Sequence, residues 1–118
     1  MLTLYGIPNC DTVKQARTRL ESEGVAYRFH NFRKDGVDAH MLSDMLAALG
    51  SDKLLNKRGT TWRKLTPPQQ ASALEDGGLA LMLAEPAIIK RPVWERDGEY
   101  RLGFQANEED AIVAWAKA

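Results

Sequence analysis

The spacing of hydrophobic and polar residues predicts a strand, a helix and a second strand in the first third of the chain. The apolar run at 2–5 predicts a buried strand, which Gly6 and Pro8 interrupt. Apolar residues then recur on one helical face over about 12–23, and a glycine follows. Residues 25–32 alternate and predict the second strand. A connection of this length between two strands implies parallel pairing with a right-handed crossover.

Short helical patterns separated by breaks follow, and they predict an all-helical insert at about 38–85. The residues expected to cap or open its helices are Asp38, Ser51, and Thr66 followed by Pro67. The first of these helices is expected to end at Gly50. Another is expected to run through about Glu75, before the break Asp76-Gly77-Gly78, and a last one from Leu79 to Glu85, before Pro86. The intervening stretch 56–65 is polar, basic and weakly periodic, and its pattern assigns no helix or strand within the insert.

The last third of the chain predicts a β-hairpin followed by a helix. Two strand-like runs, 93–96 and 99–103, flank the Asp-Gly pair at 97–98, which is typical of a two-residue hairpin turn. Asn107, with Asp110 three residues later, is the expected N-cap of the final helix.

The order of these elements predicts the fold class. It is β-α-β, helical insert, β-β-α, which makes an α/β fold with a four-stranded mixed sheet flanked by helices. A cysteine at the end of the first strand, opening the first helix, is the thioredoxin-like arrangement. We therefore expect a single thioredoxin-like domain over residues 1–118 that contains the helical insert.

The composition narrows the class of function. Sixteen Lys and Arg balance 16 Asp and Glu, so nothing indicates direct nucleic-acid binding. No apolar run approaches the roughly 18 residues of a membrane span, and the N-terminus lacks the regions of a signal peptide. We expect a cytoplasmic monomer that does not bind membranes. One cysteine and two histidines, His30 and His40, give no metal-ligand spacing, so no metal is expected.

Cys10 is the strongest candidate for a reactive residue, because it lies beside the N-terminus of the first predicted helix. Backbone N–H groups are unpaired there and the helix dipole is positive, and both favour the thiolate, which is the nucleophile. Its neighbours Asn9, Asp11 and Thr12 are polar turn and cap formers rather than core residues. The alternative is a small buried hydrophobe without chemistry, the common state of a lone cysteine.

Three basic residues are candidate anion ligands. Arg91 precedes Pro92 between apolar residues, so rigid neighbours would hold its planar guanidinium towards a carboxylate or oxyanion. Arg58 lies in a basic, hydroxyl-rich stretch with a glycine, a composition suited to clamping an anion. Lys14 in the first helix faces either the same site or solvent. For Arg58 and Arg91 the alternative is an exposed loop charge.

Three motifs in order resemble the ArsC/Spx family, and within it the YffB-like branch. They are the opening 5–14 (Tyr-Gly-Ile-Pro-Asn-Cys-Asp-Thr-Val-Lys), the central 54–65 and the segment 86–92. The resemblance covers essentially the whole chain. It implies a thioredoxin-like fold with a helical insert and a cis proline at Pro92. It also implies that Cys10 is a nucleophilic thiolate and that Arg91 is an oxyanion ligand.

The chain departs from the family pattern at informative positions. Glutathione-coupled arsenate reductases of the family use three arginines around the cysteine, of which Arg91 matches one. Asn56 stands where another would be, with Arg58 two residues on, and Phe104 falls near the third. Many Spx-type regulators, which bind RNA polymerase, carry a Cys-x-x-Cys switch, and here Val13 replaces the second cysteine.

The leading hypothesis is a glutathione-dependent thiol reductase of the YffB-like kind, with Cys10 as nucleophile and no bound cofactor. Glutathione, as co-substrate, would resolve the mixed disulfide because the chain has no second cysteine. Arg58 and Arg91 would bind its carboxylates or a small anionic thiol substrate, with Asn9, Asp11, Thr12 and Lys14 lining the site and Pro92 shaping it. The alternatives are an arsenate reductase coupled to glutathione and glutaredoxin, and a non-enzymatic regulator.

Overall fold

The computed structural model describes residues 1–118, which form two compact units. The first unit comprises Met1–Asp35 and Arg91–Ala118, and the second is Gly36–Lys90. None of the helices has both the length and the apolar character that crossing a bilayer requires.

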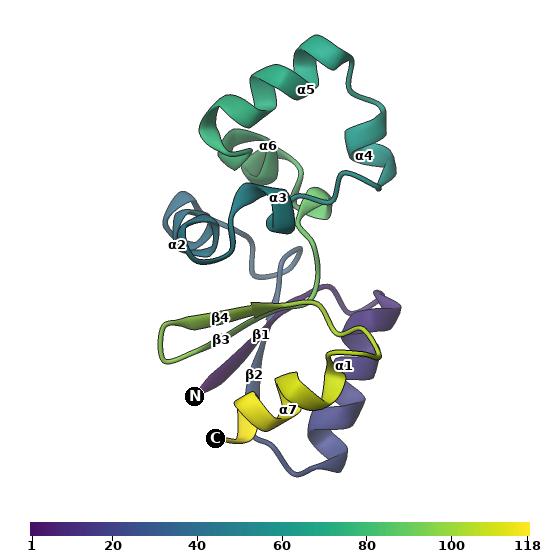
Figure 1. Cartoon of the computed structure of the whole chain (residues 1–118), viewed down its shortest axis with the longest axis vertical. Coiled ribbons are helices and arrows are strands. Elements are labelled where there is room, and N and C mark those ends of the chain that lie inside the picture. The colour runs from purple at the N-terminus through teal and green to yellow at the C-terminus, as the bar shows by residue number, and fades with distance from the viewer. The chain divides into compact units, whose positions relative to one another are not determined.

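The first unit is built on a four-stranded mixed sheet (Figure 1). Its strands are β1 (Leu2–Gly6), β2 (Tyr27–Asn31), β3 (Val93–Arg96) and β4 (Glu99–Leu102), in the spatial order β2-β1-β3-β4. β1 and β2 are parallel, whereas β3 is antiparallel to both β1 and β4. The predicted thioredoxin-like sheet is confirmed, with β2 shorter at both ends than the alternating run suggested.

Two helices, α1 (Asp11–Ser22) and α7 (Glu109–Lys117), pack on one face of this sheet (Figure 1). The core between these helices and the sheet contains residues of both helices, three strand residues and Phe104. Its members are Leu2, Leu4, Ala16, Leu20, Trp94, Phe104, Ile112, Val113 and Ala116. α1 ends as expected at a glycine. Gly24 has a φ of +67°, and Val25 N–H reaches back to the Leu20 carbonyl at 2.9 Å.

A close approach at Gly6 fixes the start of α1 against the end of β1. A Cβ at Gly6 would lie 2.6 Å from Cγ2 of Val13, which is buried in the first turn of the helix. Only a residue without a side chain lets the two segments meet this closely. The short loop between them is therefore held at both ends, and Cys10 is its last residue.

The C-terminal hairpin is confirmed, but the predicted cap of the last helix is wrong. Asp97 and Gly98 both have positive φ, 52° and 84°, as a two-residue hairpin turn requires. α7 begins after Glu108 rather than after Asn107. The Glu108 carboxylate accepts a hydrogen bond from the Gln105 N–H at 2.9 Å, which closes a turn that contains Asn107 before the helix begins.

The second unit is helical throughout. Its elements are α2 (Ala39–Leu49), α3 (Ser51–Leu54), α4 (Thr60–Arg63), α5 (Pro67–Ala73), the 3₁₀ turn η1 (Leu74–Asp76), α6 (Leu79–Ala84) and the 3₁₀ turn η2 (Pro86–Ile88). The expected cap of α2 is confirmed, since the Asp38 carboxylate accepts from the Met41 N–H at 2.8 Å. α5 opens with a full capping box, in which Thr66 and Gln69 each accept from the other's backbone N–H.

Some boundaries in this unit differ from the sequence expectation. Ser51 is the first residue of α3, and Gly50 takes the cap position. The weakly periodic stretch 56–65 contains α4, because burial of Trp62 stabilises a turn that the sequence pattern does not reveal. The helix expected through about Glu75 ends at Ala73 and continues as η1, and α6 ends at Ala84, one residue before Glu85. Both glycines of the predicted break have positive φ.

Candidate functional site

Cys10 occupies the N-cap position of α1, with extended backbone angles of φ −90° and ψ 126°. Its carbonyl accepts the first bond of the helix, from Lys14 N–H at 2.9 Å, and its own N–H donates to Ile7 at 3.3 Å. The N–H groups of residues 11–13 consequently have no acceptor within the helix. The thiol is free and half-buried, which differs from the fully buried state of an inert cysteine.

The neighbours of Cys10 form a polar surface around the thiol. Asn9, Asp11 and Lys14 are exposed, and Thr12 is half-buried in the first turn of α1. The Asp11 carboxylate lies in that first turn, where it complements the positive end of the helix dipole. The side chains predicted to line the site from this segment are thus open to solutes, with cationic, anionic and hydroxyl groups within one helical turn.

The segment Arg91–Pro92 lies at the same end of the sheet as the loop that leads to Cys10. Its peptide bond is cis, as the family resemblance implied. Val93 pairs with Tyr5 in antiparallel register, so the next opposed positions are Pro92 and Gly6. The Pro92 carbonyl accepts from Gly103 N–H at 2.9 Å. The Arg91 side chain is half-buried, with its Nε shielded from solvent.

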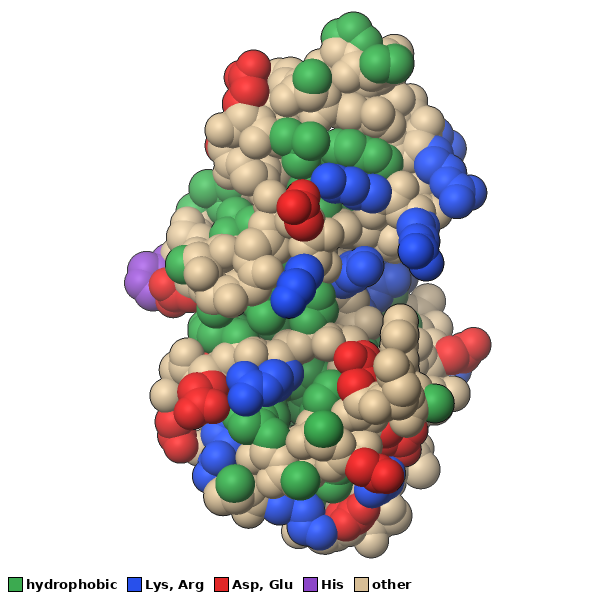
Figure 2. Space-filling view, viewed as in Figure 1, with side chains coloured by type: hydrophobic (Ala, Val, Ile, Leu, Met, Phe, Trp, Pro, Cys, Tyr) green, Lys and Arg blue, Asp and Glu red, His purple; other side chains and the backbone are tan.

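Arg58 belongs to the second unit, in the turn before α4. Its N–H donates to the side-chain oxygen of Asn56 at 3.2 Å, and its side chain is exposed. The neighbouring Lys57 is held more closely, over the Trp62 ring at 5.8 Å and beside Asp52 at 3.4 Å. Figure 2 shows Lys and Arg side chains gathered over the α4 end of this unit. Arg58 therefore presents a solvent-exposed guanidinium on a basic surface.

Two positions where the family resemblance implies arginines have other roles here. Asn56 closes the turn before α4 through its side-chain oxygen. A Cβ on Gly59 would lie 2.9 Å from the Asn56 amide nitrogen, so that amide fills the space beside the glycine. Phe104 is 3% exposed and lies with its ring 5.5 Å from that of Trp94, in the core of the first unit. Neither position supplies a cation.

The histidines do not join Cys10 in a cluster of metal-ligand residues. No group of three or more His, Cys, Asp or Glu side chains is placed to hold a metal ion. His30 packs its ring 5.1 Å from that of Tyr5 on the sheet. His40 is exposed on α2 beside Asp44 at 3.4 Å.

An ion network that the sequence did not reveal joins α1 to α7. Arg19 donates to Glu23, to Glu109 at 2.9 Å and to Asp110 at 3.1 Å, and Lys117 donates to Glu23 at 2.7 Å. Hydrogen bonds from Lys117 and then from Arg19 lower the pKa of Glu23 below its usual 4.5. Bonds to Glu23, Asp110 and Glu109 raise the pKa of Arg19 further above its usual range. Only the i,i+4 pair of Arg19 and Glu23 could have been anticipated from spacing.

We expect Glu23→Gln to change the pH dependence of stability. Because the folded pKa of Glu23 is lowered, its contribution is present above the unfolded value and disappears as pH falls through the folded pKa. The difference in unfolding free energy between wild type and Glu23→Gln should therefore be present at pH 7 and shrink towards zero in acid. Urea unfolding at pH 7, 4 and 3 measures it, because the loss begins only below the usual pKa of 4.5. Glu75→Gln on the second unit is the control, and an equal difference at every pH would contradict the expectation.

Comparison with known proteins places this geometry in a family. The model of the ArsC family matches residues 5–112. An uncharacterized protein of Haemophilus influenzae is 39% identical over 114 residues, which cover 97% of this chain and 100% of that one. A solved structure named YFFB superposes with a TM-score of 0.85 at 43% identity, covering 94% of this chain and 97% of the other.

Two further relatives show the breadth of the match. An arsenate reductase (ArsC) related protein from Brucella melitensis superposes with a TM-score of 0.79 at 43% identity, covering 95% of this chain and 93% of that one. The global transcriptional regulator Spx of Listeria innocua is 24% identical over 110 residues, 92% of this chain and 83% of its own length. The resemblance seen in the three sequence motifs is thus confirmed, and the chain belongs to the ArsC family.

Proposed function

We propose that this protein is a glutathione-dependent thiol reductase that works through Cys10. The observation that carries the proposal is the position of a free, half-buried thiol at the N-cap of α1, where three backbone N–H groups have no helical acceptor. Such groups can donate to a sulfur that bears or develops negative charge. The chain holds no other cysteine, so a thiol from outside must complete any catalytic cycle.

The reaction consists of three thiol–disulfide exchanges. The Cys10 thiolate attacks one sulfur of a substrate disulfide, forms a new S–S bond with it and releases the other half as a thiolate. A glutathione thiolate then attacks the substrate sulfur of the mixed disulfide, forms a glutathione–substrate disulfide and returns Cys10 to its starting thiolate. A second glutathione thiolate attacks that disulfide and releases the second substrate thiolate and oxidised glutathione, so two glutathiones supply the two electrons. No cofactor is needed, because glutathione is the co-substrate.

The neighbouring side chains supply the means to bind glutathione. Arg91, beside the loop that carries Cys10, and Lys14 offer cations for its carboxylates. Asn9, Asp11 and Thr12 offer hydrogen-bonding groups, and the Asp11 carboxylate suits the glutathione ammonium. Arg58 remains a predicted anion ligand on the second unit. A reductase that draws on a glutathione pool works in a reducing compartment, so we propose the cytoplasm as its location.

Mass spectrometry after incubation with oxidised glutathione tests the proposal directly. We expect one glutathione per chain, attached at Cys10, and release of the adduct by an excess of reduced glutathione. The Cys10→Ser variant should remain unmodified under the same conditions. A sulfur that stays unmodified in the folded wild-type protein would contradict the reductase proposal and favour a non-enzymatic binding role.

Arsenate reduction is a second candidate, favoured by the name of the Brucella relative. The loss of two arginine positions to Asn56 and the buried Phe104 weakens it, because fewer cations remain to bind the oxyanion. Arsenate-dependent oxidation of NADPH, coupled through glutathione, glutaredoxin and glutathione reductase, separates the two. A rate no higher than that of Cys10→Ser would exclude arsenate as substrate.

A further inference from the structure

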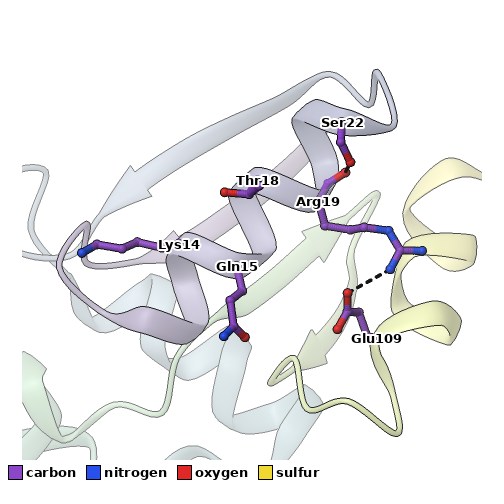
Figure 3. Close-up of a pocket in the computed structure, with 6 residues that line it drawn as sticks. All are labelled: Lys14, Gln15, Thr18, Arg19, Ser22 and Glu109. Atoms are coloured by element: carbon purple, nitrogen blue, oxygen red, sulfur yellow. Dashed lines mark hydrogen bonds and ion pairs between the residues drawn. The ribbon is translucent and has the colours of Figure 1, made fainter.

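A solvent-open groove of about 550 Å³ runs along the outer face of α1 to the start of α7. Five of its lining residues share one helical face, and the sixth comes from α7: Lys14, Gln15, Thr18, Arg19, Ser22 and Glu109 (Figure 3). Figure 3 shows Lys14 and Ser22 towards opposite ends of this face, with Arg19 reaching Glu109. The groove lies entirely within the first unit, so its geometry is set by the packing of α1 and α7 on the sheet.

The groove begins in the first turn of α1, at Lys14. Lys14 is bonded through its backbone to the Cys10 carbonyl at 2.9 Å, one helical turn from the N-cap. At a rise of about 1.5 Å per residue, Ser22 lies about 12 Å further along the helix than Lys14. The groove therefore leads along α1 away from the turn that follows Cys10.

The two ends of the groove differ in charge. At the end near Cys10, Lys14 offers an exposed ammonium. At the far end Arg19 and Glu109 line the groove as a pair, and the network that they form with Glu23, Asp110 and Lys117 has two cations and three carboxylates, a net charge of −1. Gln15 and Thr18 between them are neutral and exposed, and they can hydrogen-bond to peptide groups. A complementary occupant is negative beside Lys14 and positive beyond it.

The length of the groove selects the size of that occupant. Glutathione extends only one residue on either side of its cysteine, and its longer γ-glutamyl arm is roughly 7 Å, well short of the roughly 18 Å between Cys10 and Ser22 along α1. An extended polypeptide covers the same 12 Å with about four residues. The far carboxylates are therefore within reach of a polypeptide substrate and beyond the reach of glutathione alone.

We infer that this groove docks a polypeptide whose cysteine is held in a disulfide with glutathione, with an acidic residue beside that cysteine and a basic residue about four positions further. The inference rests on the proposed function and names its substrate class as glutathionylated protein. The Cys10 sulfur bonds to the glutathione sulfur, and the peptide leaves as a thiolate. A second glutathione then displaces Cys10 and departs as oxidised glutathione.

Two peptides of identical composition test the charge pattern, each joined to glutathione through its single cysteine. One is Lys-Ala-Ala-Ala-Glu-Cys-Glu-Ala-Ala-Ala-Lys, and the other exchanges every Lys with Glu. Because both are symmetric about the cysteine, the direction in which the chain lies does not matter. The measured quantity is the ratio of kcat/KM for the first peptide to that for the second, from release of the free peptide in the presence of glutathione.

The decisive variant is Ser22→Lys, which adds a cation at the far end, about 18 Å along α1 from Cys10. We expect it to lower that ratio about fivefold relative to wild type, since an exposed charge pair is replaced by repulsion. Ser43→Lys, on an exposed position of α2, adds the same charge away from the groove and should leave the ratio unchanged. Comparing ratios removes the intrinsic difference in reactivity between the two peptide disulfides.

The outcomes distinguish a failure of this docking inference from a failure of the proposed reductase function. If wild type turns over 2-hydroxyethyl disulfide and both peptides, but Ser22→Lys and Ser43→Lys give the wild-type ratio, the groove does not dock the polypeptide and the reductase proposal stands. If wild type turns over none of the three disulfides, the reductase proposal itself fails, and the substrate class fails with it.

Discussion

Replacing Cys10 by serine is expected to lower the turnover of 2-hydroxyethyl disulfide by a factor on the order of 10³. A serine oxygen cannot form the S–S bond of the mixed disulfide, and the chain has no second sulfur nucleophile among its side chains to take over. What remains should be the direct reaction of glutathione with the substrate. Oxidation of NADPH coupled through glutathione reductase measures the rate, with the protein-free rate subtracted.

This variant separates a chemical loss from a structural one. The Cys10 side chain does not cap α1, whereas serine is among the preferred N-cap residues. Cys10→Ser should therefore be at least as stable to thermal unfolding as wild type. Turnover by a folded Cys10→Ser protein above about a tenth of the wild-type rate would show that the sulfur is not the nucleophile.

Local signals explain why the surroundings of Cys10 could be predicted. A buried strand, a break, and an amphipathic helix lie within about twenty consecutive residues, and the close approach of Gly6 to Val13 fixes the loop between them. Asp38 and Thr66 also act as predicted, because a cap needs only the backbone of the next few residues. Each of these features is specified by neighbours in the sequence, so periodicity and turn chemistry are enough to find them.

Features that depend on distant segments could not be predicted in the same way. Arg19 finds two of its partners in α7, some ninety residues later, and nothing in the sequence of α1 indicates them. Trp62 stabilises the short helix α4 through burial, which weak local periodicity does not show. Asn107 has the right residue type for a cap, but it lies in a turn that the Glu108 carboxylate closes on the Gln105 N–H, and α7 begins one residue later. Tertiary contacts decide these cases.

The core of the first unit should be most sensitive at Trp94, for which replacement by alanine is expected to lower the free energy of unfolding by about 4 kcal/mol. Trp94 is fully buried and lies between the sheet and the Phe104 ring, and its indole N–H donates to the Gly103 carbonyl at 2.9 Å. The alanine variant leaves both a cavity and a carbonyl without its donor. The loss is a large share of the roughly 5–15 kcal/mol typical of a domain.

Two matched variants identify the causes of that loss. Trp94→Phe keeps an aromatic ring but removes the N–H, so it should cost less than Trp94→Ala in urea unfolding followed by circular dichroism. Trp115→Ala removes the same side chain from a half-buried position, where it contacts Glu99 at 3.0 Å and Arg101 at 4.9 Å, and should also cost less. A larger loss at Trp115 than at Trp94 would contradict this description of the core. Because the Gly103 N–H also donates to the Pro92 carbonyl, the Trp94 bond anchors the segment Arg91–Pro92 that precedes β3, and stability and site share this contact.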